Sequence, residues 1–136
     1  ILKNSPHKMF LFNETLVYLC VSLSTWKNVL KNIFGGSHDF FKKPRRKTLH
    51  KILYNIGKAQ LENDPELFKK LTDEIWEFRT LYQGLQYRFL AFWDKTSTNQ
   101  TLVITTHGFV KKRHDVPKNE IRKAVQLRTK YFNSKL

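Results

Sequence analysis

Cations and a histidine gather in the second half of the chain, in a pattern suited to chemistry on a phosphate. Arg79 and Arg88 lie in two consecutive segments of alternating polarity, and His107 stands shortly before a run of cations. A guanidinium binds phosphate through paired N–H groups, and an imidazole exchanges protons near neutral pH. RNA cleavage without a metal needs both functions: a proton leaves the 2′-hydroxyl nucleophile, another reaches the leaving oxygen, and the phosphorane is stabilised. The run that follows is Lys111, Lys112 and Arg113.

Each of these side chains also has a structural explanation. Arg79 falls opposite the aromatic residues of its strand, where it is either a phosphate ligand or a solvated partner of an acid such as Glu77. Arg88 falls in mid-strand, where a charge is costly unless it is exposed or paired. His107, expected to end a strand, is either a general acid or base or a core histidine held by a backbone carbonyl. Residue types alone leave these alternatives open.

Other residues are suited to holding RNA rather than cutting it. Phe109, expected in a loop, can stack on a base, and Arg113 adds a nearby cation. Trp76 and Trp93 carry similar rings, but their alternating pattern places them in the core. The densest basic cluster suits ribosomal RNA or an acidic protein segment, and consists of Lys42, Lys43, Arg45, Arg46 and Lys47.

The charge balance predicts a polyanionic partner. The 136 residues include 25 lysines and arginines against 11 acids, which gives a formal charge of +14. Such an excess attracts RNA, DNA, an acidic protein or an anionic membrane surface, and composition does not choose among them. The length suits one domain, whose core draws on the 40% of residues that are hydrophobic.

Metal, disulfide and membrane roles find little support. Five histidines are scattered, and neither an HExxH motif nor a carboxylate cluster occurs, so we expect no metal and no cofactor. Cys20 is the only cysteine, which excludes an intrachain disulfide and fits a reducing, cytoplasmic setting. The most apolar run, Leu16 to Trp26, is about half of the roughly 20 residues that a membrane-spanning helix needs.

Helices are predicted ahead of the candidate residues. Asp64 before Pro65 has the form of an N-cap followed by the first helical residue, which predicts a short helix ending at Leu71. Before it, four apolar residues at i, i+3, i+4, i+7 spacing predict a helix over residues 44–60: Leu49, Ile52, Leu53 and Ile56.

Strands are predicted to carry the arginines and the histidine. Period-two alternation indicates a strand over residues 75–81, Gln83-Gly84 supplies a turn, and further strands are expected over Tyr87–Trp93 and Leu102–His107. Short links make this an antiparallel meander. Asp115-Val116-Pro117 then opens a final helix, so the order is helices, sheet, helix, an α+β fold. That helix packs through Ile121, Ala124, Val125 and Phe132, and directs outward Lys118, Arg122, Lys123 and Lys130.

Three pieces of sequence stand in order along the chain. They are KILYNI at residues 51–56, IWEFR at 75–79 with QYR at 86–88, and HGFVKK at 107–112 with Pro117 beyond it. Together they resemble the phage Gp49-like branch of the RelE/HigB-type toxins of bacterial toxin–antitoxin systems. The resemblance covers residues 38–133, and the third piece is its most specific part.

The resemblance implies a compact α+β fold, with a curved antiparallel sheet carrying its helices on one side. It also implies a ribonuclease that cuts mRNA in the ribosomal A site, and a helix-turn-helix antitoxin as partner. Residues 37–136 would form the toxin domain. The residues that it favours around the scissile phosphate are Arg79, Arg88, His107, Lys111 and Lys112.

Two departures accompany the resemblance. Residues 1–36 match poorly and are either a variant first strand within Phe10–Leu23 or extraneous sequence, and periodicity leaves that run as strand or buried helix. Some relatives carry a catalytic tyrosine where Val116-Pro117 stands here, which shifts acid–base work to His107, His114 or a lysine. The alternatives are therefore a non-catalytic RNA- or ribosome-binding relative and, less favoured because no helix-turn-helix pattern is evident, a DNA-binding module.

Overall fold

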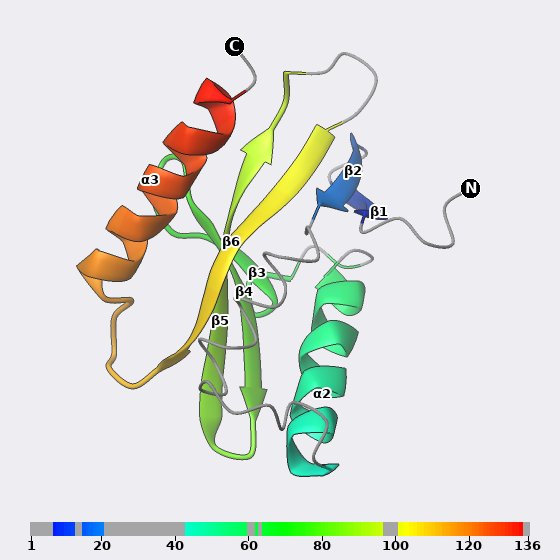
Figure 1. Cartoon of the computed structure of the whole chain (residues 1–136). Coiled ribbons are helices and arrows are strands. Elements are labelled where there is room, and N and C mark those ends of the chain that lie inside the picture. The colour runs from blue at the N-terminus through cyan, green and yellow to red at the C-terminus, as the bar shows by residue number, and fades with distance from the viewer. Residues whose placement is uncertain are drawn as a thin grey trace.

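A six-stranded sheet with a helix on either side forms the described part of the chain (Figure 1). The computed structural model describes residues 7–12, 15–20, 43–59, 62, 64–96 and 101–134. Its helices are α2 (Lys43–Ala59) and α3 (Lys118–Asn133). Its strands are β1 (His7–Phe12), β2 (Thr15–Cys20), β3 (Phe68–Lys70), β4 (Trp76–Tyr82), β5 (Leu85–Asp94) and β6 (Thr101–Lys111). The predicted α+β class is confirmed.

Strands β4 to β6 form the antiparallel meander that the alternating pattern predicts, and β3 pairs with β4 at its edge. The sheet order is β1-β2-β6-β5-β4-β3, and β2 joins β6 in parallel. The turn between β4 and β5 lies at Gln83-Gly84 as predicted, with φ angles of 51° and 76°. Two successive positive φ angles are typical of a type I′ hairpin turn, whose twist matches that of the strands. This turn fixes which residues of β4 and β5 face each other.

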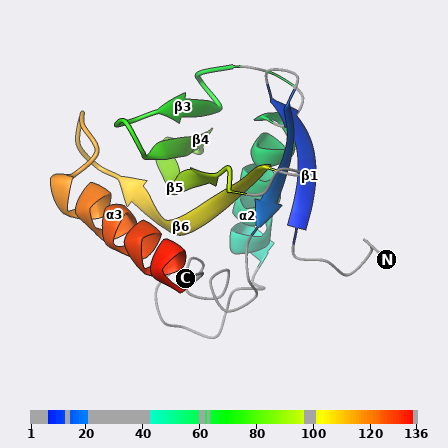
Figure 2. The same cartoon turned by 90° about the horizontal axis from the view of Figure 1, so that it is seen from above.

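The two helices pack on opposite faces of the sheet, so the expectation of helices on one side is wrong. Neighbouring residues of β5 point to opposite faces: Phe89 packs with the α2 residues Ile52 and Ile56, whereas Leu90 packs with Ala124 of α3. Figures 1 and 2 show α2 and α3 on either side of β5 and β6. Both faces of the meander are therefore partly covered, and each buries apolar side chains.

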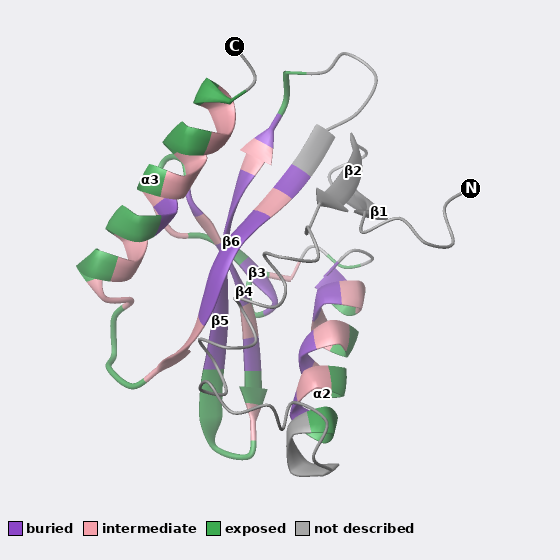
Figure 3. Ribbon diagram, in the orientation of Figure 1, coloured by how far each residue is buried: buried purple, intermediate pink, exposed green. Residues whose placement is uncertain are grey.

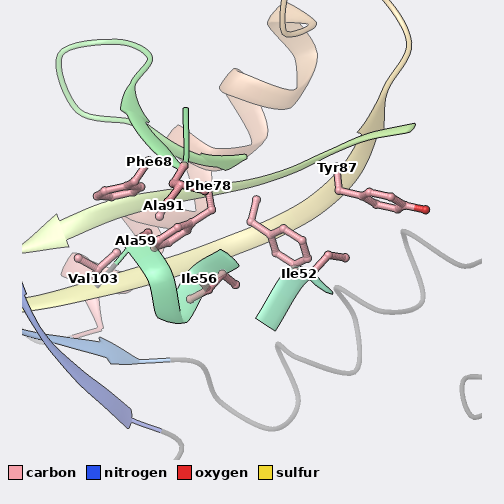
Figure 4. Packing of buried hydrophobic residues seen from close by; sticks show 10 residues of the cluster. Ile52, Ile56, Ala59, Phe68, Phe78, Tyr87, Ala91 and Val103 are labelled. Carbon is pink, nitrogen blue, oxygen red and sulfur yellow. The ribbon is translucent and has the colours of Figure 1, made fainter. Parts of the chain in front are cut away.

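Aromatic rings dominate the core on the α2 side (Figure 4). The ring of Phe68 stacks on Phe78 at a centroid distance of 4.3 Å and on Trp76 at 5.0 Å. Trp76 meets Trp93 edge to face at 5.7 Å. Both tryptophans pack against this core, as their strand positions predict. Buried apolar residues of α2 close the cluster, which explains the helical spacing seen in the sequence.

The predicted short helix ending at Leu71 is wrong. The carbonyl of Asp64 accepts hydrogen bonds from the amides of Leu67 and Phe68, and its Oδ1 accepts one from the Glu66 amide at 2.8 Å. Asp64 therefore caps a turn as predicted, but only a single turn forms. Phe68 instead begins β3 and pairs with Phe78 of β4. Packing its buried ring in the aromatic core stabilises the chain more than another helical turn would.

Two polar side-chain contacts hold α3 on the sheet. Near its start Glu120 contacts His107 of β6, and near its end the Tyr131 hydroxyl donates to Asp94 of β5 at 2.6 Å. Between them Ala124 is the buried residue of the helix. The helix follows Pro117 as predicted, and Figure 3 shows its outer side exposed. The outward cations are confirmed as exposed: Lys118, Arg122, Lys123 and Lys130.

The N-terminal segment contributes strands where it is described. The run Phe10–Leu23, for which periodicity allows a strand or a helix, supplies the end of β1 and all of β2, and residues 13–14 and 21–23 lie outside the described part. The basic residue Lys42 also lies outside it. No helix among the described residues is long and apolar enough to cross a membrane.

Candidate functional site

Three rows of side chains cross strands β4, β5 and β6 on the face that carries α3. In the middle row Arg79 lies opposite Arg88, which lies opposite Phe109. The row nearer α3 is Glu77, Leu90 and His107, and the row nearer the β4–β5 turn is Leu81, Gln86 and Lys111. Directly opposed residues have Cβ atoms about 4.5–5.5 Å apart, and diagonal neighbours about 7–8 Å. The sheet thus brings together two arginines, a lysine, a glutamate and a histidine.

Glu77 lies between the two arginines. Its Oε1 is 3.6 Å from Nε of Arg79, and its Oε2 is 3.5 Å from Nε of Arg88. The carboxylate is only 6% exposed, and neither Oε2 nor the two Nε atoms has a hydrogen-bond partner among the described residues. The three groups therefore attract one another as charges without good hydrogen-bond geometry, which leaves donor capacity on both guanidinium groups.

Arg88 is buried, with 3% of its side chain exposed. Its Nη2 donates to Oε1 of Gln86 at 2.8 Å, and its Nη1 donates to the carbonyl of Tyr87 at 3.1 Å. Burial lowers the pKa of Arg88 from its ordinary value, an effect that the charge of Glu77 opposes. A guanidinium stays charged in proteins, so Arg88 is a fixed cation beneath the surface.

Arg79 is the accessible member of the pair, with 21% of its side chain exposed. Its Nη1 donates to the carbonyl of Pro65 at 3.3 Å and lies 3.7 Å from Oε1 of Glu66. Glu66 is 80% exposed, so water screens this second contact. Of the two explanations expected for Arg79, the structure shows the pairing with Glu77, and the side chain remains partly exposed.

His107 is a buried residue in a continuous strand, so the expectation that it ends the strand is wrong. Only 4% of its side chain is exposed, because α3 lies over it. Its Nε2 lies 2.6 Å from Oε2 of Glu120, and its Nδ1 lies 3.0 Å from the Thr106 hydroxyl. Burial lowers the pKa of His107, Lys123 acts in the same direction, and the hydrogen bond to Glu120 opposes the shift.

Beside His107, the Thr106 hydroxyl has two acceptors for its proton: Nδ1 of His107 and the carbonyl of Leu90. The Thr106 hydroxyl is also 3.1 Å from the carbonyl of Leu90, and it has a single proton to donate. When that proton goes to Nδ1, a neutral ring donates from Nε2 to Glu120. When it goes to the Leu90 carbonyl, Nδ1 must donate instead, and a proton lies between Nε2 and Glu120. Because 24% of the Glu120 side chain is exposed, this carboxylate connects the buried ring with solvent.

Strand β6 extends to Lys111, beyond the predicted end. Regular alternation after His107 places Phe109 and Lys111 on the same face as His107, and a bulge between positions 105 and 107, opposite Leu90 and Ala91, turns this face away from that of Val103. Phe109 is therefore half-buried against the α3-side core, with its ring 5.9 Å from that of His107, and the expectation of a loop position is wrong. Lys111 is half-buried, and the exposed loop begins with Lys112 and Arg113.

The basic cluster ahead of the sheet does not join these rows. Arg46 and Lys47 are exposed on α2, which packs on the other face. Lys43 and Arg45 lie in α2, where their side chains are outside the described part, as is all of Lys42. Sequence reasoning also missed two members of the site. Glu77 entered only as a pairing partner, and Glu120 was not singled out, although its place in the first turn of α3 is a visible signal for contact with the sheet end.

Comparison with known proteins assigns the chain to a family. Residues 39–129 match the family described as Phage derived protein Gp49-like (DUF891). The match covers well over half of the 136 residues, so the chain belongs to this family. It is a toxin-like, RelE-type family that is associated with toxin–antitoxin systems. No curated protein and no solved structure matches the chain.

Proposed function

We propose that the chain is the toxin of a toxin–antitoxin system, a metal-independent endoribonuclease that cuts mRNA on the ribosome and thereby inhibits translation. The observation that carries the proposal is the pair Arg79 and Arg88, placed opposite each other beside Glu77 on a face that α3 covers only in part. Membership of a toxin-like family and the charge of +14 support the same conclusion.

In this proposal the arginines have different tasks. Arg79 contacts the scissile phosphate through its outer nitrogens, and Lys111 and the exposed Lys112 contact phosphates beside it. Arg88 is a buried positioning residue: it holds Glu77, which in turn holds Arg79. Its fixed charge also favours the phosphorane, whose negative charge exceeds that of the ground state.

The proposed proton donor and acceptor is the His107–Glu120 pair. The 2′-oxygen forms a bond to phosphorus as its proton leaves, and the bond to the 5′-oxygen breaks as that oxygen gains a proton. In this proposal the partly exposed carboxylate of Glu120 exchanges the proton with the RNA. The buried His107 accepts this proton from Glu120 or returns it. This role replaces the simpler expectation that His107 itself reaches the RNA.

The remaining cations serve binding. The exposed Arg113 lies between β6 and α3, and the cluster from Lys42 to Lys47 lies at and before the start of α2. We propose that both contact ribosomal RNA, or the acidic part of a helix-turn-helix antitoxin. In this proposal the half-buried Phe109 packs beside Arg88 and His107 and does not stack on a base.

The test is induced expression together with mapping of transcript ends. Growth should stop, and translated transcripts should be cut, whereas a reporter transcript without a start codon should stay intact. Co-expression of the protein encoded by the neighbouring gene should restore growth. Uncut transcripts in cells that keep growing would contradict the proposal.

A second candidate function is a ribosome-binding relative without catalysis. The burial of both Arg88 and His107 favours it, because neither ring nor guanidinium meets solvent directly. Such a protein would sediment with ribosomes in a salt-sensitive way and leave a reporter mRNA intact. Cleavage by purified protein on programmed ribosomes, in the presence of a chelator, distinguishes the two candidates.

A further inference from the structure

The outer side of α2 carries a line of cations around an exposed tyrosine. We call it the α2 stripe, and its members are Lys47, His50, Lys51, Tyr54 and Lys58. At about 100° per residue these positions fall within one narrow arc of the helix. The buried residues of α2, among them Ile52 and Ile56, fall on the opposite side. Figure 3 shows exposed and half-buried segments along this outer side.

The helix α2 carries basic residues and no acidic residue of its own. Residues 43–59 contain no aspartate or glutamate, and they include Lys43, Arg45, Arg46, Lys47, Lys51 and Lys58. Within the stripe Lys47 and Lys58 are exposed and Lys51 is half-buried. Like charges at neighbouring helix positions repel one another, so the arrangement lowers helix stability and is favourable when an anion lies over it.

Tyr54 is the feature that points to a particular ligand. It is 63% exposed, and Nζ of Lys51 lies 5.2 Å from the centre of its ring. One turn further, Gly57 offers an open position, where an added Cβ would meet nothing within 4 Å. A glycine inside a helix costs stability, and the space that a side chain would occupy here is open. The ring face and the open space beside it suit a flat, stacking group.

We propose that the α2 stripe binds a single-stranded segment of RNA, with Tyr54 stacked on an unpaired base and Lys47, Lys51 and Lys58 in contact with phosphates. An acidic protein segment would use the cations and have no need of the aromatic face, whereas unpaired nucleotides use both. The stripe spans about 16 Å along the helix, at 1.5 Å per residue, which is long enough for a few nucleotides.

This second site lies on the other face of the sheet from Arg79 and Arg88. The inference takes RNA as the ligand from the proposed function, but it does not require cleavage. A toxin that used both faces would hold one RNA segment with α2 while the arginines act on another. Loss of the stripe should therefore weaken binding and leave the cleavage step of bound protein unchanged.

The experiment measures fluorescence anisotropy of a labelled 12-nucleotide oligoadenylate with the whole chain, at salt concentrations from about 50 to 200 mM. Tyr54→Ala should weaken binding by about 5- to 100-fold, the range for one stacked base. Tyr54→Phe should retain wild-type affinity, because it keeps the ring, and Tyr54→Leu should behave like the alanine variant. A duplex of the same length should not discriminate among the three.

A charge-matched pair of variants tests the phosphate contacts. Replacing Lys47, Lys51 and Lys58 with Gln should reduce the slope of log affinity against log salt by about 2, at about 0.7 per phosphate on a single strand. The control replaces Lys118, Lys123 and Lys130, which are exposed on α3, and should reduce the slope less.

The outcomes separate this inference from the proposed function. Equal affinities for the Ala, Leu and Phe variants would overturn the stacking site, and equal slopes for the two lysine triples would overturn the phosphate contacts. If RNA affinity depends on Tyr54 but the wild-type protein cleaves no RNA, the result would contradict the proposed nuclease activity and support the RNA site on α2. Tight, Tyr54-independent binding of an oligoglutamate instead of RNA would mark the stripe as a surface for acidic protein.

Discussion

His107 and Glu120 are joined by a contact of 2.6 Å that ties the middle of β6 to the first turn of α3. The His107 ring is buried, whereas a quarter of the Glu120 side chain is exposed to solvent, so the ring reaches solvent only through this carboxylate. Because burial outweighs the hydrogen bond to Glu120, the pKa of His107 lies below its ordinary value of 6.5. Burial therefore favours the neutral form of the His107 ring.

Stability should fall as the pH drops below the pKa of the unfolded histidine. In the unfolded chain His107 binds a proton near pH 6.5, and in the folded chain it does so only at lower pH. The unfolded state then binds more protons, so the contribution of this residue is fully present above that pH and is lost below it. Urea midpoints at pH 7.5, 6.5 and 5.5 measure the effect.

Two variants separate His107 from other titrating groups. His107→Gln removes the titration, so its midpoint should vary less between pH 7.5 and 5.5. Glu120→Gln removes the carboxylate that favours the charged ring, so the pKa of His107 should fall further and the loss at acid pH should steepen. Parallel pH curves for all three proteins would contradict the assignment.

Local patterns predicted those parts of the fold that short-range physics determines. The helix α2 has an apolar spacing that is complete within its own residues, and the β4–β5 turn rests on the adjacent pair Gln83-Gly84. Strand β3 could not be found in this way. Asp64-Pro65 carries a real start signal, but the side chain of Phe68 is recruited by aromatic residues farther along the chain, which no local window contains.

In the candidate site, too, local patterns predict some features, whereas others depend on tertiary packing. Alternation and the turn position are enough to place Arg79 opposite Arg88 on one face. The burial of His107 depends on where α3 crosses the sheet and on a bulge in β6, and neither leaves a mark in the composition of that strand. Phe109 was misplaced for the same reason, since Gly108 resembles the start of a loop but lies within β6.

The second fastening of α3 should contribute measurably to stability. Asp94 is 2% exposed, and its Oδ2 accepts a 2.6 Å hydrogen bond from the Tyr131 hydroxyl. Tyr131→Phe keeps the ring against Phe92 but removes that donor, which should cost about 1.5–3 kcal/mol, the range for a hydrogen bond to a charged group. Chemical denaturation gives the value.

Tyr54→Phe is the matched control, because that tyrosine hydroxyl is on an exposed side chain. Its free energy of unfolding should stay within about 0.5 kcal/mol of wild type. A Tyr131→Phe variant as stable as this control would show that the contact with Asp94 contributes nothing.

Replacement of Arg88 should act first on stability. The guanidinium is 3% exposed and stands beside a glutamate that is 6% exposed, so Arg88→Ala leaves Glu77 with one cationic neighbour instead of two. Removing one partner of a buried ion pair costs about 3–5 kcal/mol. Arg88→Met with Glu77→Gln should recover part of this loss, since no carboxylate remains unpaired on that side. A single alanine variant with unchanged unfolding energy would show that Arg88 does not hold the site together.

Replacement of Arg79 should act on the rate of cleavage instead. Its side chain is partly exposed, and its contacts are with a carbonyl, an exposed glutamate and Glu77, so Arg79→Ala should change the melting temperature only modestly. The single-turnover rate on programmed ribosomes should fall by roughly 10²-fold, the scale of losing one preorganised charge donor, while ribosome affinity changes much less. Arg79→Lys should restore the rate only in part, because a point charge cannot make a bidentate contact.

Melting temperature and rate are measured on the same samples, so a slower rate in a fully folded protein cannot be attributed to unfolding. If Arg79→Ala cuts as fast as wild type, this arginine is a structural partner of Glu77 and the scissile phosphate lies elsewhere.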